Sequence, residues 1–525
     1  MEEDRTSIYI QHQRWGIAHQ LFWRGGGNVE PQRKISCDVT IIGAGPAGLA
    51  SAWFLQQLGY DVLVLENEPT IGGATRTEAW NNVLLPCGAT YFAEPPDTFR
   101  ELLNALQLTP VPLPDDALWL SGTPYRNFWH DSVLSELPIP EVERAAFRRF
   151  RTDIESLPPF PFPLPDVLPD PWRALAAQPA EAVVNTYTSP TLRSLLNAYA
   201  RSVLGAPLKD ISAACLYDFY RAELAWQFLR PRYSLRGGLA SLCQRLAEHI
   251  GSERILLQCL AFRIEHVSNT CVRTLGITAR GESIAIESGA AVFAGPKLIA
   301  KHLIPELPPA QQQAILRLQY IPYLTVHLVT PFRLVPEDTF GLWLPEAQLV
   351  TDIADTTPLH PQPVEGFLSC LYVPLSRWQR KLLLEEESIR SLATAAVREV
   401  LQLLAPEWAS NISELACFAW GHALIIPTPI ALLGAAQQAR RPVGHIVFAN
   451  TDNEASPAIE NAIEQAARAA EIVHALLHSH STAPLVRRLI QTYPLMPCSH
   501  AHPLQPVDRT VTNSRTATST SLAPL

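Results

Sequence analysis

Hydrophobic residues first become periodic at Asp38, after a polar stretch. That stretch, residues 1–36, ends in RGGGNVEPQRK, and its glycines predict a flexible N-terminal extension. The run DVTII then predicts a buried strand, and apolar spacing after a glycine turn predicts a helix from about Pro46 to Leu58 that ends at Gly59. The run DVLVLE predicts a second strand, so the segment is typical of a βαβ unit in an α/β fold.

Helical and strand patterns alternate along the rest of the chain. Apolar residues have helical spacing in SPTLRSLLNAYARSVLG, DISAACLYDFYRAELAWQFL and GLASLCQRLAEHIG, and again over 385–405. Short strands are predicted in RILLQCLAFRIEHV, TCVRTLGIT, SIAIES and AAVFAGP, and residues 320–375 alternate like the strands of a sheet. The segment GHIVFANTDNEASPAIENAIEQAARAAEIVHALLH predicts a last strand, a turn and a long helix.

Two segments lack either pattern. Seven of the fifteen residues of LPPFPFPLPDVLPDP (157–171) are proline, which excludes a helix or a central strand there. We expect a stiff loop over a substrate lobe, and a role as an SH3 ligand stays open. The end of the chain, VDRTVTNSRTATSTSLAPL, is rich in Ser and Thr and predicts a disordered C-terminal tail.

Composition narrows the class of protein and of partner. A chain of 525 residues with 47% hydrophobic and 17% charged residues predicts a globular protein of two or three lobes. A net charge of −9 without a cluster of Lys and Arg disfavours nucleic acid and anionic membrane surfaces, so we expect a small-molecule partner.

The lack of a targeting signal and the pattern of the cysteines predict a cytoplasmic protein. The nine cysteines are scattered without a Cys-x-x-Cys pair, which is typical of reduced thiols. The first residues lack the order of a signal peptide, and no apolar run reaches about 18 residues, the length of a membrane span.

The glycine turn after the first strand predicts a dinucleotide site. Gly43, Gly45 and Gly48 have the G-x-G-x-x-G spacing, which lets a pyrophosphate lie on the N-terminus of the following helix. Glu66 ends the second strand, 23 residues beyond Gly43, where a carboxylate binds ribose hydroxyls and repels a 2′-phosphate. These residues predict FAD or NAD and do not distinguish the two.

A second glycine motif resembles one known family. ENEPTIGGATRTE resembles the second glycine signature of the flavin-containing amine oxidase superfamily, which includes protoporphyrinogen oxidases and phytoene desaturase-like enzymes. CGATYF, YSLRGGLASLCQRLAEHIG and IVFANTDNEASPAIENAIEQAARAA resemble further segments of that family in the same order. The resemblance implies FAD and an α/β fold with a discontinuous Rossmann-type FAD-binding domain and an inserted α+β substrate domain.

The resemblance also implies boundaries. After the extension 1–36, the FAD-binding domain comprises 37–95, 232–300 and 415–480, the substrate domain comprises 96–231 and 301–414, and a tail covers 481–525.

By the same resemblance, several residues are expected to contact FAD. Glu66 binds the adenosine ribose, Ala261 lies at the adenine, Asp452 reaches the ribityl or phosphate region, and Ile459 begins a helix aimed at the flavin N1–C2=O edge. The residues expected at the pyrophosphate or beside the flavin are Gly43, Gly45, Gly48, Gly72, Gly73 and Gly88.

Three positions depart from the family pattern. Ala74 stands where many members have arginine, and Arg76 either compensates or caps a surface. Asn450 replaces a glycine of the closing strand. Where amine oxidases of the family commonly place a lysine near flavin N5, this chain has Tyr323 or Thr325.

Candidates for substrate chemistry are Trp420, His422 and Tyr91. His422 follows the segment that often faces the pocket in the family, and it could act as an acid or base or hydrogen-bond within the core. Tyr91 could shape the substrate space or pack in a strand. No metal site is predicted, because no acidic partner supports the histidine groups at His474 and His478 or at 498–502.

Together these residues predict an FAD-dependent oxidoreductase that takes a hydride from a C–N or C–C bond of a small hydrophobic substrate. Electrons would pass to oxygen or another acceptor. The missing lysine favours a desaturase or isomerase of an apolar or isoprenoid substrate as the alternative. A flavin-binding scaffold without turnover is a third reading, and the substrate and the oligomeric state stay open.

Overall fold

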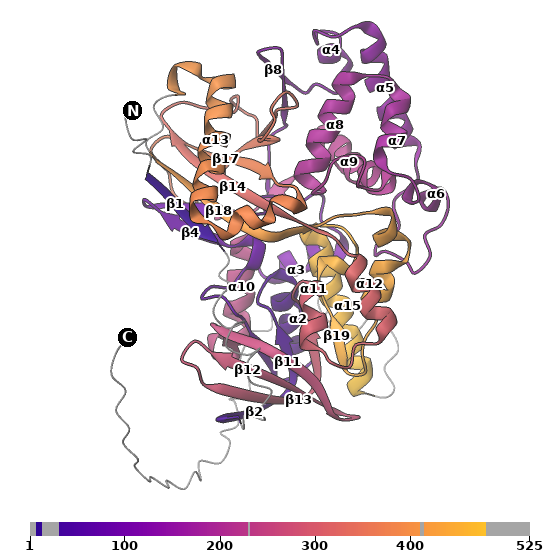
Figure 1. Ribbon diagram of the computed structural model, residues 1–525, viewed down its shortest axis with the longest axis vertical. Coiled ribbons are helices and arrows are strands. Elements are labelled where there is room, and N and C mark those ends of the chain that lie inside the picture. The colour runs from indigo at the N-terminus through magenta and orange to yellow at the C-terminus, as the bar shows by residue number, and fades with distance from the viewer. Residues whose placement is uncertain (1–6, 13–30, 229–231, 410–413, 479–525) are drawn as a thin grey trace.

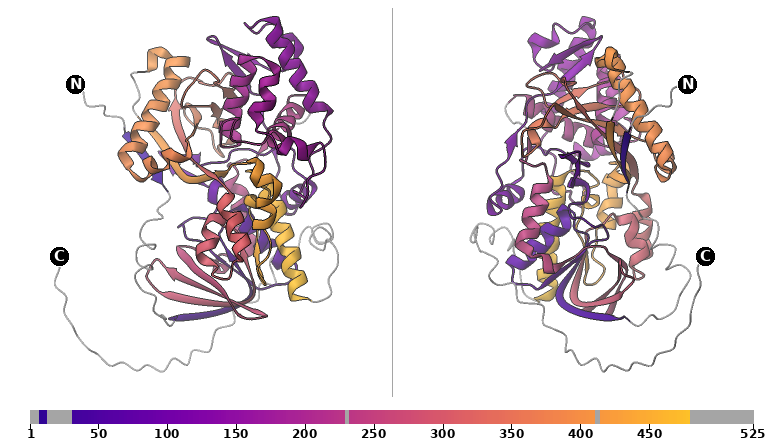
Figure 2. Two further views of the ribbon diagram at one scale, coloured as in Figure 1. Left: turned by 45° about the vertical axis from the view of Figure 1, so that its right-hand side comes forward. Right: turned by 90° about the vertical axis from the view of Figure 1, so that its left-hand side faces the viewer.

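The computed structural model describes residues 7–12, 31–228, 232–409 and 414–478. Within them, two large sheets lie one above the other (Figure 1), with the sheet of β2, β11, β12 and β13 at the bottom and the sheet of β14, β17 and β18 above. Both views of Figure 2 show helix α15 standing on the lower sheet and reaching toward the upper part of the molecule. The α/β class predicted from the sequence is confirmed.

The lower sheet has the architecture of a dinucleotide-binding domain. Its strands run in the order β10-β3-β2-β13-β12-β11, and β19 also pairs with β13. Strands β10, β3, β2, β13 and β19 are parallel, whereas β11 and β12 form an antiparallel extension. The bounds are β2 Arg33–Ile42, β3 Val62–Leu65, β10 Ile255–Leu256, β11 Cys259–Ser268, β12 Cys271–Thr278, β13 Ser283–Phe293 and β19 Ile446–Phe448.

Helices cover both faces of this sheet, which explains why its central strands are almost continuously apolar. Val39 and Ile41 of β2 pack into the cluster built with α2, α3, α10 and α15, while Ile42 packs on the other side in the cluster that includes α11 and α12. The bounds are α2 Pro46–Gln57, α3 Asp97–Ala105, α10 Ala240–Ile250, α11 Lys297–Leu303, α12 Pro309–Arg317, α14 Ala436–Ala439 and α15 Ile459–Leu477.

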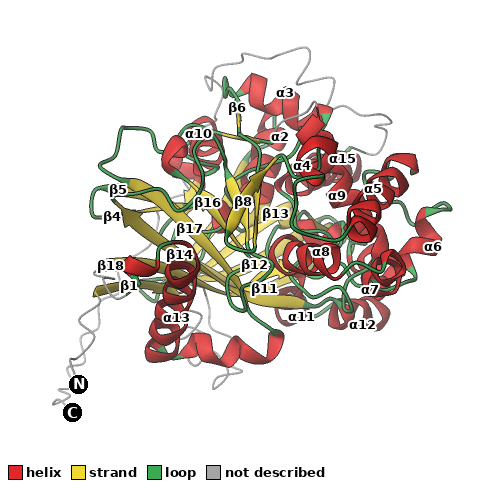
Figure 3. Cartoon of the chain, turned by 90° about the horizontal axis from the view of Figure 1, so that it is seen from above, coloured by secondary structure: helices red, strands yellow, loops and turns green. Residues whose placement is uncertain are grey.

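The upper sheet is mostly antiparallel, with the order β1-β18-β14-β17-β16-β15-β7-β8. Helix α13, Glu386–Leu404, packs Ile389, Ala393 and Val397 against it. Seen from above, α13 lies on one side of β14, β17 and β18, and helices α5 to α9 gather on the other (Figure 3). The strand bounds are β1 Ser7–His12, β7 Ala117–Leu120, β8 Thr123–Arg126, β14 Tyr320–Thr330, β15 Gly341–Trp343, β16 Asp352–Asp355, β17 Phe367–Pro374 and β18 Glu414–Ile425.

The helical part of the substrate lobe lies between residues 131 and 228. Its helix α8 begins after Ser189, whose side chain accepts a hydrogen bond from Leu192 N, so the chain itself marks the start of that helix. The bounds are α4 Asp131–Leu134, α5 Glu141–Ser156, α6 Trp172–Ala176, α7 Ala180–Val184, α8 Pro190–Val203 and α9 Ala213–Phe228, and the small ladders are β4 Thr77–Trp80 with β5 Val83–Pro86 and β6 Val111–Pro112 with β9 Tyr233–Ser234.

Two sequence predictions need correction. The N-terminal extension is not flexible throughout, because Ser7–His12 forms β1 parallel to β18 and β2 already begins at Arg33. Strand β1 pairs there with a strand about 400 positions away, which begins at Glu414. The runs SIAIES and AAVFAGP were expected as separate strands but form the single strand β13.

The predictions for the proline-rich loop and for two helices agree with the structure, whereas the predicted tail is not described. Residues 157–171 contain no helix or strand, as their prolines predict, and the helices predicted at 46–58 and 385–405 are α2 and α13. The predicted disordered tail, 481–525, lies outside the described residues. No helix in the described ranges is both long and apolar enough to cross a membrane.

Candidate active site

The glycine turn between β2 and α2 leaves room for a phosphate group. Gly43 has a φ of 105°, which favours glycine, and a Cβ on Gly48 would overlap the carbonyl oxygen of Gly43. Gly45 precedes α2 without a side-chain cap, and the first turn carries no acidic residue. The N–H groups at this helix end therefore remain available for an anion.

The second glycine motif lies directly against this turn. Gly72 N donates a hydrogen bond to Ala44 O at 2.8 Å, and a Cβ on Gly73 would lie 3.3 Å from Gly45 Cα. Gly88 packs equally closely, because its Cβ would overlap the carbonyl oxygen of Ala74. The structure thus brings together glycines that are up to 45 residues apart in the chain.

Glu66 lies at the end of β3, as predicted. Its carboxylate accepts hydrogen bonds from Ala44 N at 2.7 Å and Glu68 N at 2.8 Å, which orient it beside the glycine turn. Burial raises the pKa of Glu66, and the two backbone donors oppose that effect. Ala261 lies on β11 and is buried.

The closing segment is anchored through a polar cluster that also contains residues from outside the predicted motifs. Asp452 accepts hydrogen bonds from Lys297 N at 2.8 Å and from the Tyr320 hydroxyl at 2.6 Å. The Lys297 ammonium donates to Asn450 Oδ1 at 2.9 Å and to Asn453 Oδ1. Burial lowers the pKa of Lys297 to about 7, although Asp452 opposes this. The sequence indicated Asn450 and Asp452, whereas Lys297 and Tyr320 come from separate segments that no motif connects with them.

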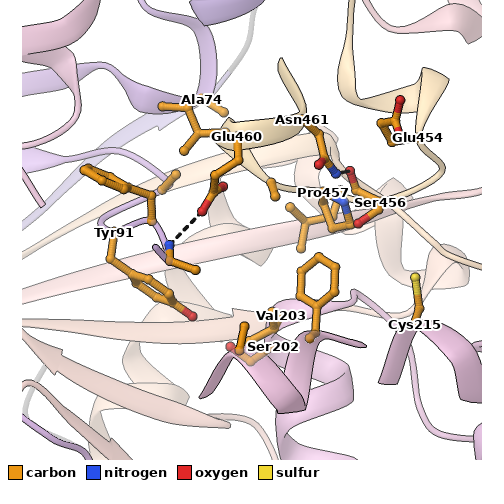
Figure 4. A pocket seen from close by; sticks show the side chains of 18 of the residues that line it. Ala74, Tyr91, Ser202, Val203, Cys215, Glu454, Ser456, Pro457, Glu460 and Asn461 are labelled. Atoms are coloured by element: carbon orange, nitrogen blue, oxygen red, sulfur yellow. Dashed lines mark hydrogen bonds between the residues drawn. The ribbon is translucent and has the colours of Figure 1, made fainter. Parts of the chain in front are cut away.

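A cavity of about 470 Å³ lies between the lobes of the molecule. In Figure 4, Ser202, Val203 and Cys215 on α8 and α9 line the side that faces Ala74 and the start of α15. Phe160 and Phe162 of the proline-rich loop also line the cavity. Ile459, the first residue of α15, lies in its wall, as do the residues from Gly88 to Glu94.

The sheet side of the cavity is held by two hydrogen bonds to one carbonyl. Thr325 Oγ1 donates to Cys87 O at 2.8 Å, and Trp420 Nε1 donates to the same oxygen at 2.7 Å. Both side chains line the cavity, so they fix the position of the Gly88 segment. Arg76 lies behind this wall with its guanidinium 4.8 Å from the Trp420 ring. It is 5% exposed, so the idea that it caps a surface is wrong.

The predicted candidates for substrate chemistry separate in the structure. Tyr91 and Trp420 line the cavity, whereas His422 is not among the lining residues and packs its ring edge-on against Tyr320. Burial, and then the nearby Arg380, lower the pKa of His422 to about 4, so the ring is neutral at pH 7. His422 therefore does not face the substrate space as the sequence suggested.

The cavity contains acidic side chains that sequence reasoning also missed. Asp218 of α9 and Asp352 of β16 line it, and burial raises the pKa of each to about 7. A single acidic residue within the aromatic stretch CLYDFY was the available signal for Asp218.

Metal binding has no support in the described residues. They contain no group of three His, Cys, Asp or Glu side chains that could hold a metal ion. His474 and His478 each lie 2.7 Å, through Nδ1, from the Tyr60 hydroxyl, and residues 498–502 lie outside the described ranges.

The residues present fit FAD. The glycine turn leaves an open cradle at the start of α2, Glu66 lies beside that turn at the end of β3, where a carboxylate can bind ribose hydroxyls, and the cavity begins at Ala74 and Gly88, beside the second glycine motif. The Asn450 side chain bonds Gly295 O and Lys297, so its extra volume is held within the protein. The fold and site thus define an FAD-dependent oxidoreductase.

Comparison with known proteins agrees with this class. The chain belongs to the flavin-containing amine oxidoreductases, whose family model matches residues 46–474. AofH of Mycobacterium tuberculosis, assigned as a flavin-containing monoamine oxidase, is 25% identical over 293 residues, which are 53% of this chain. The match spans 61% of AofH, about three fifths of its length.

Solved structures share the fold. Putrescine oxidase with bound putrescine is 20% identical, with a TM-score of 0.65 over 84% of this chain and 100% of that chain. Cyclohexylamine oxidase from Brevibacterium oxydans is 22% identical, with a TM-score of 0.64 over 84% of this chain and 99% of that chain. At these identities the likeness concerns the fold alone.

Proposed function

We propose that this chain oxidises a C–N bond of a small amine that carries no carboxylate. The supporting observation is the charge of the cavity. Its lining includes five carboxylates and, among the described residues, no Lys, Arg or His; the five are Glu94, Asp218, Asp352, Glu454 and Glu460. Such a lining attracts a cationic amine and repels a fatty acid or an amino acid carboxylate.

The aromatic residues of the wall suit the apolar part of such a substrate. Tyr91, Tyr199, Tyr323, Tyr372 and Trp420 line the cavity, and their ring faces attract cations as well as alkyl groups. The mostly apolar wall also excludes water from the reacting bond.

Few of the chain's own groups need to act in the reaction. Thr325 and Trp420 hold the Cys87 carbonyl and so position the Gly88 segment against which the substrate space opens. The N-terminus of α15 at Ile459 places partial positive charge at the cavity wall, where it stabilises negative charge. Bound FAD would accept the hydride that leaves the carbon beside the amine nitrogen, and that carbon then becomes the carbon of an iminium group.

One observation favours a second candidate, a desaturase or isomerase of an apolar substrate. Strand β14 places Tyr323 and Thr325 in the cavity wall and contains no lysine. The five carboxylates weigh against this candidate, since an apolar substrate makes no favourable contact with their charges.

Anaerobic mixing of the FAD-loaded protein with candidate substrates tests the proposal. We expect straight-chain amines to bleach the visible flavin absorbance. Amino acids that carry the same alkyl group should do so at least about tenfold more slowly. Readmitting oxygen, or adding an artificial acceptor, then separates an oxidase from a dehydrogenase. Bleaching by a neutral polyene but by no amine would overturn amine oxidation in favour of the second candidate.

A further inference from the structure

Asp218 differs from the other carboxylates of the cavity in having no partner. In the described part of the chain its carboxylate makes no hydrogen bond and no ion pair. The other four are engaged, through Arg100 to Glu94, Thr351 Oγ1 to Asp352, Leu164 N to Glu454, and Ala93 N to Glu460.

The surroundings of Asp218 make this lack of a partner costly. The residue is half-buried, and the surface it keeps faces the cavity, beside Cys215 and Phe219. The charge of Arg221 lowers the pKa of the Asp218 carboxyl, but the Arg221 guanidinium donates its hydrogen bond to Leu157 O, at 2.6 Å. A buried carboxylate without a partner destabilises a fold, and a cationic ligand would relieve that cost.

Asp218 is unsuited to hold the nitrogen that is oxidised. A carboxylate paired with an ammonium group raises the pKa of that group and keeps it protonated. Loss of a hydride from the neighbouring carbon requires the neutral nitrogen, whose lone pair forms the C=N bond. Asp218 also lies on α9, whose residue Cys215 points toward Ser456 and Glu454 at the cavity wall, on the side away from Ala74 (Figure 4).

We propose that Asp218 is a specificity-determining residue that binds the ammonium group at the far end of a diamine while the other nitrogen is oxidised. This inference rests on the proposed amine oxidation and names its substrate class. The alkyl chain between the two nitrogens would lie along the aromatic wall.

The test compares straight-chain α,ω-diamines with monoamines of the same chain length. For the wild type we expect kcat/KM to be about 10- to 100-fold higher for the best diamine, since a buried charge-assisted hydrogen bond is lost with the monoamine. In Asp218→Asn the preference should fall to about one, mainly through a rise in the KM for the diamine. Asp210→Asn, which removes an exposed carboxylate just before α9, is the matched control and should keep the preference.

Urea unfolding and the pH dependence of KM separate this role from a structural one. Because burial of its surroundings raises the pKa of the Asp218 carboxyl to about 7, its ionisation opposes folding at pH 8, so Asp218→Asn should unfold at a higher urea concentration than the wild type. The wild-type KM for the diamine should fall as the pH rises through about 7, where Asp218 ionises, and the variant should lack this dependence.

The outcomes distinguish this inference from the proposed function. If neither series of amines reduces the flavin, both are overturned. If both series are oxidised equally by the wild type, amine oxidation stands and the role of Asp218 is refuted, even where Asp218→Asn fails to fold.

Discussion

Lys297 should make the stability of this protein rise steeply with pH, and replacing it by methionine should remove that rise. The side chain is fully buried, and its ammonium has amide oxygens of Asn450 and Asn453 as acceptors. Burial lowers its pKa from 10.5 to about 7. Between these values the unfolded chain binds a proton that the folded protein does not, so the free energy of unfolding increases with pH across this window.

The size of the effect follows from the same two values. The gap between about 7 and 10.5, at about 1.36 kcal/mol for each pH unit, corresponds to roughly 5 kcal/mol in all. Because both ends of the window are gradual, roughly 3 to 4 kcal/mol should develop between pH 7 and pH 10.

Urea unfolding of the FAD-loaded protein at steps of pH measures this. We expect the wild type to gain roughly 3 to 4 kcal/mol over Lys297→Met from pH 7 to pH 10. Lys301→Met, on the same helix but only half-buried, should keep the wild-type profile. If the curves of the wild type and Lys297→Met run parallel over this range, the ammonium is not desolvated and the reasoning is refuted.

Three further changes test the site. Gly48→Val should give a folded protein that no longer retains FAD, seen as loss of visible absorbance after gel filtration, because its side chain overlaps the Gly43 carbonyl; retention at wild-type levels would contradict this. Thr325→Val should cost about 1 kcal/mol in urea unfolding by removing one donor to Cys87 O, and an unchanged midpoint would contradict it. Arg440→Ala should speed proteolysis within 157–171, because Arg440 holds the loop through Leu164 O, and cleavage at the wild-type rate would show that the loop is held elsewhere.

Local patterns were sufficient to predict the lower lobe. Its strands and α2 are set by short apolar runs and by glycines that must adopt one backbone geometry, so Gly43, Gly48 and Glu66 lie where the sequence placed them. The strand Ser7–His12 was missed because β18, with which it pairs, begins at Glu414, and no local signal reports a contact over that distance. The composition of the cavity was missed for the same reason.

Asp218 shows why the substrate side is harder to predict than the cofactor side. Helical spacing located α9, but whether its one central carboxylate faces solvent, an arginine or a cavity depends on how α8, β14 and α15 pack around it. A cofactor common to a family fixes the residues around it, whereas the substrate contacts vary from member to member.

The replacement of a family glycine by Asn450 has a physical compensation in this chain. A larger residue beside a cofactor is tolerated only if its side chain has room and partners elsewhere. Asn450 finds both, since its amide donates to Gly295 O and its oxygen accepts from Lys297, which in turn reaches Asn453. The substitution and the buried lysine therefore depend on each other: without Lys297 the Asn450 and Asn453 oxygens lose a donor, and without the asparagines the ammonium is buried with no neutral acceptors. Replacing Asn450 with glycine, the residue that the family resemblance places there, should accordingly cost less stability in urea unfolding in the Lys297→Met background than in the wild type.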